Sequence, residues 1–152
     1  VGTLGVVAER RVSLYARVAP LPKLPLNDGP PVPIALIKVA MGDDGRLLRA
    51  LPGLGFKGVV IEGMGAGHVH ADVAPLIGEL AAKVPVVLAS RSMTGPVFTS
   101  TYGYPGAEID LIKRGAIPAG YLSGLKARLL LGLCLRTTTD AAAVRDAFAP
   151  YQ

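Results

Sequence analysis

Residues 59–68 read Val-Val-Ile-Glu-Gly-Met-Gly-Ala-Gly-His. A short apolar run of this kind predicts a buried strand. Glycines at alternate positions, Gly63, Gly65 and Gly67, follow the run at once. In an α/β protein, a strand that ends in glycines brings backbone close to a ligand at the carboxyl edge of the sheet. We therefore take residues 63–68, the glycine loop, as the centre of the fold and of any functional site.

The segments around the glycine loop alternate between strand and helix patterns. Apolar runs at 34–39 and 85–90 predict further buried strands, and a short last strand is expected at 117–119. Helices are expected around 47–51, at 73–84 with Asp72 as its cap, at 107–114, at 125–136 and after Asp140. This alternation predicts a doubly wound, Rossmann-like three-layer α/β sandwich around a parallel sheet of about four strands.

The beginning of the chain does not follow this alternation. Residues 1–17 predict a β-hairpin with a polar turn at Glu9 and Arg10. Residues 18–33 carry prolines at 20, 22, 25, 30, 31 and 33 and predict an extended connection. We therefore expect a hairpin over 1–17, a proline-rich connection over 18–33 and an α/β domain over 34–152.

Length and composition predict a globular protein of about one domain. The chain has 152 residues, of which 51% are hydrophobic and 18% are charged. The net charge is +5, but the 16 Lys and Arg are scattered, so no nucleic-acid partner is expected. No apolar run reaches the roughly 18 residues of a membrane span, and no signal peptide is recognisable. We expect a cytoplasmic protein that binds no membrane.

The glycine loop could also belong to a dinucleotide site or to a metal site. A dinucleotide fingerprint needs glycine at its first, third and sixth positions, but the sixth position counted from Gly63 is His68. His68, His70 and Asp72 alternate as zinc ligands can. However, a catalytic site usually needs three protein ligands, these are the only 2 histidines, and Asp72 is expected to cap a helix. We therefore expect no metal and no cofactor.

Other polar residues are expected at the same edge of the sheet. Arg91 follows the strand at 85–90 and would either bind an anion or, as we favour, tie loops together through backbone carbonyls. Tyr102 and Tyr104 lie in a loop rich in glycine and proline and would either bind a ligand or cover the sheet. No nucleophile with a base partner is recognisable among the nearby hydroxyls of Ser90, Ser92, Thr94, Thr99, Ser100 and Thr101.

Several stretches, taken in this order, resemble the carboxy-terminal domain of bacterial L-asparaginases. They are GVVIEGMGAG at 58–67, PVVLASR at 85–91, TGPV at 94–97, GYL at 120–122 and KAR at 126–128. The resemblance runs from about Gly2 to Tyr151. The Gly-His-Val at 67–69 and the TYGYPG loop at 101–106 are similar to actinobacterial members of the family.

This resemblance implies a two-domain hydrolase that converts L-asparagine to L-aspartate and ammonia. In the family, threonines, an aspartate and a lysine of the larger amino-terminal domain carry the chemistry. Neither a Thr-Gly-Gly-Thr nor a Gly-Thr-Asp stretch occurs here. The chain therefore resembles the smaller domain without its amino-terminal partner, and we expect no catalytic residue in it and no activity from it alone.

The resemblance also implies that this domain completes an active site across a subunit interface, in a homodimer or homotetramer. The family's glycine loop supplies an asparagine near the substrate, and His68 stands at the matching position. Some members supply a glutamate from the loop after the third strand, and spacing from Arg91 puts Tyr102 there, with Glu108 the nearest carboxylate downstream. His68 and Tyr102 are thus the expected substrate-binding residues, with the glycines of the glycine loop and Arg91 shaping the loops.

Two other functions stay open at this point. The glycine loop at a sheet edge is also typical of a stand-alone Rossmann-like module that binds a nucleotide or an amino acid. An asparaginase-like subunit of a tRNA-dependent amidotransferase shares the family's ancestry. The residues also leave the preference between asparagine and glutamine open.

Overall fold

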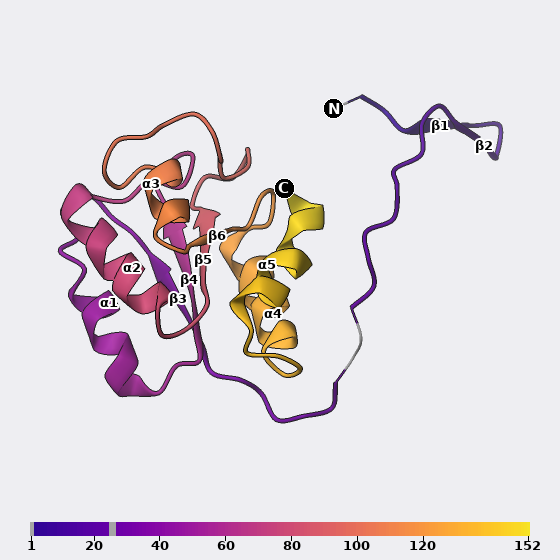
Figure 1. Cartoon of the computed structure of the whole chain (residues 1–152). Coiled ribbons are helices and arrows are strands. Elements are labelled where there is room, and N and C mark those ends of the chain that lie inside the picture. Colours follow the sequence, from indigo (N-terminus) through magenta and orange to yellow (C-terminus); the bar gives the residue numbers. More distant parts are fainter. Residues whose placement is uncertain (1, 25–26) are drawn as a thin grey trace.

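The computed structural model describes residues 2–24 and 27–152 of the chain. Its centre is a parallel sheet of four strands that follow one another across the sheet in sequence order. The strands are β3 (Ile34–Lys38), β4 (Gly58–Gly63), β5 (Val86–Ser90) and β6 (Ile117–Pro118). Helices cover both faces of the sheet, so the predicted three-layer α/β sandwich is confirmed (Figure 1).

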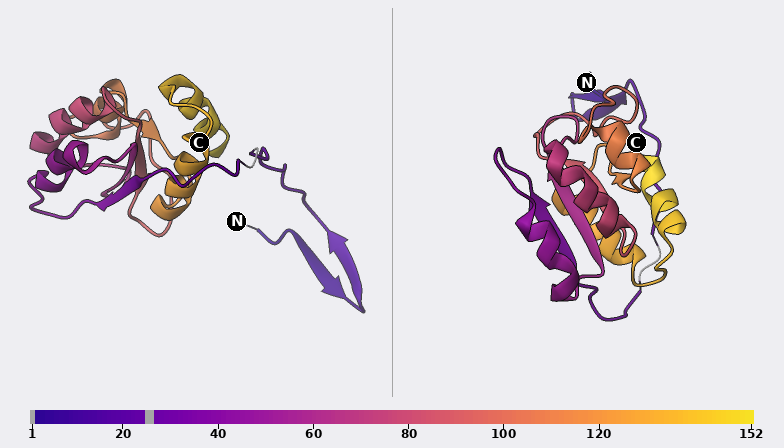
Figure 2. Two further views of the ribbon diagram at one scale, coloured as in Figure 1. Left: turned by 90° about the horizontal axis from the view of Figure 1, so that it is seen from below. Right: turned by 60° about the vertical axis from the view of Figure 1, so that its left-hand side comes forward.

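The helices divide between the two faces of the sheet (Figure 1, Figure 2). One face is covered by α1 (Arg46–Ala50), α2 (Ala74–Ala81) and α3 (Glu108–Lys113). The other face is covered by α4 (Gly124–Cys134) and α5 (Ala141–Phe148). Short 3₁₀ turns accompany the helices at η1 (Leu51–Leu54), η2 (Ala71–Val73) and η3 (Ala149–Tyr151). In the ranges that the structure describes, no helix has both the length and the apolar character needed to cross a membrane.

The order of the strands corrects one detail of the prediction. A doubly wound sheet reverses direction at a switch point, whereas here the order β3-β4-β5-β6 never reverses. Because parallel crossovers are right-handed, connections that all move the same way put their helices on the same face. This explains why α1, α2 and α3 share a face. The second face is left to α4 and α5, which come after the last strand.

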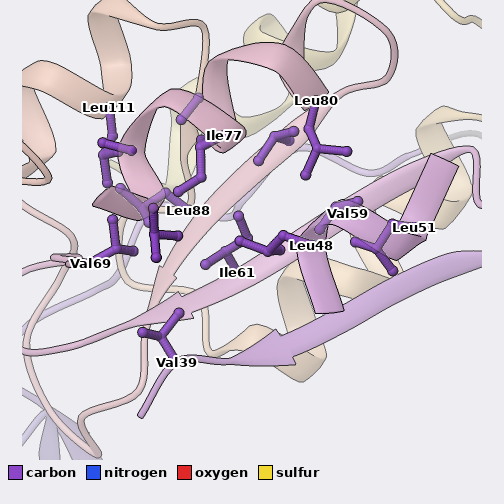
Figure 3. Packing of buried hydrophobic residues seen from close by; sticks show 14 of the residues in the cluster. Val39, Leu48, Leu51, Val59, Ile61, Val69, Ile77, Leu80, Leu88 and Leu111 are labelled. Atoms are coloured by element: carbon purple, nitrogen blue, oxygen red, sulfur yellow. The ribbon is translucent and has the colours of Figure 1, made fainter. Parts of the chain in front are cut away.

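Strand β4 is an inner strand of the sheet, and all of its residues except Glu62 are buried. Its register places Ile61 beside Ile37 of β3 and Leu88 of β5. Ile61 belongs to the cluster under α1 and α2, which also contains Ile77 and Leu80 (Figure 3). The neighbouring Val60 points to the opposite cluster, under α4 and α5. A strand buried on both faces needs apolar residues that point both ways, which explains the run Val59-Val60-Ile61 in the sequence.

Of the two helix caps predicted at Asp140 and Asp72, the structure has only the first. Asp140 caps α5, because its carboxylate accepts hydrogen bonds from the backbone amides of Ala142 and Ala143 at 3.1 and 3.3 Å. The predicted cap at Asp72 is wrong. His70 instead caps the turn η2, with its Nδ1 accepting from the amide of Asp72 at 3.3 Å. The chain makes this 3₁₀ turn first, so α2 begins only at Ala74.

An antiparallel hairpin precedes the sandwich, as predicted, and lies apart from it in Figure 1. It is formed by β1 (Gly5–Ala8) and β2 (Arg11–Leu14). The turn residues Glu9 and Arg10 both have positive φ, at 48° and 64°, which is the geometry that matches the twist of a two-residue hairpin. Its apolar side chains are largely exposed, and two strands alone are marginally stable, so this hairpin needs a further surface to pack on.

The sandwich predicts very different costs for two leucines of α4. Leu131 is fully buried against the sheet, whereas Leu129 on the same helix is 65% exposed. Leu131→Ala should lower the free energy of unfolding by about 2–5 kcal/mol, because it leaves a cavity under β4. Leu129→Ala should change it by less than about 0.5 kcal/mol. Urea unfolding followed by circular dichroism measures both, and equal losses would contradict the packing described.

Candidate functional site

The glycine loop is a tight turn that folds back on the end of β4. The backbones of Met64 and His68 form an antiparallel bridge, with hydrogen bonds of 2.8 Å in both directions. The amide of Gly67 also donates to the carbonyl of Met64, at 3.0 Å. The hydroxyl of Ser90 in β5 donates to the carbonyl of Gly65 at 2.6 Å. These loop amides are used inside the loop, unlike those of a dinucleotide loop, which point to the pyrophosphate.

Glycine is required where the turn returns to the strand. A Cβ on Gly63 would lie 2.7 Å from the carbonyl carbon of Gly67, a distance that real Cβ atoms essentially never show. Gly65 and Gly67 have φ of +51° and +107°, in the left-handed region that favours glycine. The alternate glycines therefore allow the chain to reverse in direct contact with its own backbone.

Arg91 joins the ends of the strands beside this turn. Its backbone amide donates to the carbonyl of Gly63 at 2.9 Å. Its guanidinium Nη1 donates to the carbonyl of Val39, just beyond β3, at 2.8 Å. Arg91 thus ties neighbouring segments together through backbone carbonyls, which is the role that we favoured over anion binding.

His68, the last residue of the glycine loop, has both ring nitrogens in hydrogen bonds. Its Nε2 lies 2.9 Å from Oε2 of Glu108, at the start of α3, and its Nδ1 lies 2.7 Å from the hydroxyl of Tyr104. The side chain of His68 is 18% exposed, and that of Glu108 is completely buried. The result is a chain of side chains, Glu108–His68–Tyr104, that runs from the interior to the surface. We call it the relay.

Glu108 also holds the loop that carries the tyrosines, residues 98–106, which we call the tyrosine loop. Its Oε1 accepts from the backbone amides of Thr101 at 3.0 Å and Tyr102 at 2.6 Å. Burial by itself raises the pKa of Glu108, but the hydrogen bonds from these amides and from His68 outweigh it and lower the pKa below its ordinary value. Glu108 is therefore an ionised carboxylate that only accepts hydrogen bonds.

Aromatic rings surround His68 at the surface. Tyr102 and Tyr104 both meet its imidazole edge to face, with ring centres 5.1 and 5.4 Å away. Phe98 stacks parallel to Tyr102 at 6.4 Å. The two tyrosines are 42% and 50% exposed, so the cluster presents aromatic faces and hydroxyls to whatever lies opposite. The structure thus brings together His68 and Tyr102, the two substrate-binding residues expected from the sequence.

The sequence did not predict that Glu108 and Tyr104 are hydrogen-bonded to His68. Glu108 stood out only as the nearest carboxylate downstream, because a charged residue is rarely buried completely and nothing local predicts it. Tyr104 was noted as a loop residue, but its bond to His68 joins residues 36 positions apart. The available signal was an acidic residue in the first turn of the helix that follows the tyrosine loop.

The described part of the cluster shows neither an activated hydroxyl nucleophile nor a metal site. In residues 2–24 and 27–152, neither histidine is hydrogen-bonded to a serine or threonine hydroxyl, and Ser90 uses its hydroxyl on the glycine loop. Within the same ranges, no group of three or more His, Cys, Asp and Glu side chains is arranged to hold a metal. The arrangement is suited to binding and orienting a ligand through hydrogen bonds and aromatic faces.

An open parallel sheet with helices on both faces and a glycine-rich turn at its carboxyl edge defines a Rossmann-like α/β domain. The chain belongs to the glutaminase/asparaginase C-terminal domain family, whose model matches residues 33–148. The resemblance found in the sequence is therefore confirmed at the level of the family.

Several asparaginases and amidotransferase components are similar in sequence to this chain. A probable L-asparaginase of Deinococcus radiodurans is 41% identical over 91 residues, which cover 60% of this chain and 27% of that protein. An L-asparaginase of Bacillus licheniformis is 29% identical over 148 residues, covering 97% and 45%. One component of the glutamyl-tRNA(Gln) amidotransferase of Aeropyrum pernix is 33% identical over 116 residues, covering 76% and 26%.

Among solved structures, the chain is similar to a probable cytoplasmic L-asparaginase from Campylobacter jejuni. The TM-score is 0.76 and the sequence identity 29%, over 96% of this chain and 46% of that one. The match includes the α/β sandwich and extends into the hairpin. The chain spans about half, or less, of the length of these proteins.

The buried carboxylate predicts a pH-dependent contribution to stability. Since the pKa of Glu108 is lowered by folding, its stabilisation is fully present above the ordinary value of 4.5 and is lost as the pH falls through the lower folded value. Glu108→Gln should therefore lower the free energy of unfolding by about 1–3 kcal/mol at neutral pH. The gap to the unaltered chain should shrink in acid, as measured by urea unfolding at several pH values.

A matched control for this prediction is Glu79→Gln, because Glu79 is exposed on α2. This variant should change stability by less than about 0.5 kcal/mol across the same pH range. A gap between Glu108→Gln and the unaltered chain that does not depend on pH would contradict an ionised Glu108.

The close return of the glycine loop predicts that Gly63→Ala is costly. The added methyl group would collide with the backbone of Gly67 and should lower the free energy of unfolding by about 1–3 kcal/mol. Gly53→Ala is the control, because a Cβ there meets nothing within 4 Å. Hydrogen exchange of the Met64 and His68 amides locates the damage. Unchanged protection in Gly63→Ala would argue against the turn described.

Proposed function

We propose that this chain is the carboxy-terminal domain of an L-asparaginase, an amidohydrolase that converts L-asparagine and water to L-aspartate and ammonia. The catalytic threonines belong to the amino-terminal domain of the whole enzyme, and this domain binds and orients the substrate. The observation that carries the proposal is the cluster of His68, Tyr102 and Tyr104 at the carboxyl edge of a family-matched sheet. Among the described residues, no serine or threonine hydroxyl is hydrogen-bonded to a histidine that could activate it.

The cluster acts across a subunit interface in this proposal. His68 and Tyr102 reach the active site of a neighbouring subunit, and the glycine loop and Arg91 hold them in place. Two features support it: the tyrosines are about half exposed, and hydrogen bonds to Glu108 and Arg91 within the chain fix the loops. The whole enzyme then assembles as a homodimer or homotetramer, without a cofactor, a metal or a nucleic acid.

The whole enzyme works in the cytoplasm in this proposal. The similar Campylobacter jejuni protein is described as a probable cytoplasmic L-asparaginase. A similar Haemophilus influenzae protein is described as a probable periplasmic L-asparaginase, so fractionation of the native cells decides between the two places.

A second candidate function is that of an amidotransferase component that depends on tRNA. It is favoured by the similarity to the amidotransferase component of Aeropyrum pernix, at 33% identity over 76% of this chain. That alignment covers only 26% of the archaeal protein. Dependence of the glutaminase or asparaginase activity on charged tRNA would favour this candidate over a free-standing hydrolase.

The main test is hydrolysis of L-asparagine, measured as released ammonia. The 152-residue chain should be inactive even at high concentration, whereas the full product of its gene should be active and oligomeric by light scattering. Clear turnover by the chain alone would overturn the proposal, and so would a full product that leaves asparagine intact.

The contribution of the domain is tested with the two histidines. In the full product, His68→Ala should lower kcat/KM roughly tenfold to a hundredfold, because it removes hydrogen bonds worth about 1.5–3 kcal/mol. His70→Ala is the matched control, since this exposed side chain only caps the turn η2 and should leave kcat/KM unchanged. Equal effects of the two substitutions would contradict a specific role of His68.

A further inference from the structure

Residues 149–152 lie beside the loop that follows β6, at the same edge of the sheet as the glycine loop (Figure 1). The carbonyl of Tyr151 accepts a hydrogen bond from the backbone amide of Tyr121 at 2.9 Å. The side chain of Gln152 donates from its Nε2 to the carbonyl of Pro118 at 3.1 Å. Two residues that follow α5 are therefore bonded to both ends of segment 118–121.

Gly120 allows the two segments to approach this closely. It has a φ of +58°, and a Cβ there would collide with the carbonyl group of Tyr151. Tyr151 in turn packs against the cluster under α4 and α5, which contains the fully buried Phe148. The contact at Gly120 is thus made between two backbones, and it is anchored to the interior of the sandwich.

The carbonyl of Gly120 connects this contact to the tyrosine loop. It accepts a hydrogen bond at 3.0 Å from the amide of Val97, the residue just before the loop. The next amide, that of Phe98, donates to the carbonyl of Ala66 in the glycine loop at 3.0 Å. Two successive amides are therefore held by two different loops, and together they fix the position of Phe98, whose ring stacks on that of Tyr102.

Side-chain packing does not join the start of the tyrosine loop to the C-terminal residues. A hollow of about 330 Å³ lies here, lined by residues 96–101 and by Tyr121 and Gln152. The ring of Phe98 is 39% exposed. Hydrogen bonds through Gly120 therefore make the connection between the two segments.

We propose that Tyr151 and Gln152 form a latch, which holds Gly120 and through it positions Val97 and Phe98 at the start of the tyrosine loop. The relay holds the middle of the same loop. One ring of the aromatic cluster is thus positioned by residues that lie outside the cluster. The latch does not depend on the proposed function, because it involves no substrate and is tested on the 152-residue chain itself.

The first test is to remove Tyr151 and Gln152 and to follow amide hydrogen exchange by NMR. The amide of Val97 should lose protection about tenfold or more, because its acceptor is no longer fixed. The amides of Thr101 and Tyr102 should change by less than about twofold, since the relay still holds them. Unchanged protection of Val97, or an equal loss at Thr101, would overturn the latch.

The second test uses Gly120→Ala in the chain with and without the latch. In the 152-residue chain the added methyl group should displace Tyr151 and lower the protection of Val97 about tenfold or more. Without the latch it should add less than about threefold, because the atoms that it would meet are gone. Losses that add in full would overturn the latch.

Gly55→Ala is the matched control for backbone strain. Gly55 has a φ of +77°, and a Cβ there meets nothing within 4 Å. The protection of Val97 should be unchanged in this variant. A loss as large as that in Gly120→Ala would show that strain alone acts on Val97 and would overturn the latch.

Two further variants separate the latch from a general loss of stability. Gln152→Ala removes one hydrogen bond of an exposed side chain, so the fold is kept, and the protection of Val97 should fall about twofold to tenfold. Val144→Ala leaves a cavity under α5 and destabilises the whole sandwich. It should leave the exchange of Val97 unchanged, because a loop amide exchanges by local opening. No loss in Gln152→Ala, or an equal loss in Val144→Ala, would overturn the latch.

Discussion

Burial of β4 on both faces is the constraint from which the rest of the structure follows. Both faces of the strand are buried except at Glu62, so each needs a layer of helices, and its backbone needs a partner strand on each side. The functional residues gather where the strand ends, at its carboxyl end. There the glycine loop turns the chain back at once, because Gly63 and Gly67 come too close for any side chain. The site lies at this exit.

A second feature is the buried Glu108, which connects segments that are separate in the sequence. Its carboxylate accepts two backbone amides of the tyrosine loop and the imidazole of the glycine loop. Asp110, two residues later in α3, accepts the amide of Gly106 at the other end of the tyrosine loop. Two acidic residues of one short helix therefore hold a loop that has no regular structure.

The site combines a rigid base with an exposed surface. The bonds beneath His68 are internal, whereas the rings of Phe98, Tyr102 and Tyr104 are partly open to solvent. Such a surface is consistent with the proposal that the domain completes a site in a larger asparaginase, because contact groups that are oriented in advance lose little entropy on binding. The apolar side chains of the hairpin are likewise exposed to solvent.

The strands, most of the helices, the parallel sheet and the glycine loop follow from the amino-acid sequence alone, because they depend on local periodicity and on glycines. The family follows from it too, through motifs kept in order. The unreversed strand order, the turn that His70 caps in place of Asp72, and the chain Glu108–His68–Tyr104 emerge only in the folded molecule. Those features arise where elements distant in sequence meet at one edge of the sheet. Burial and hydrogen bonding there depend on neighbours that no local pattern contains.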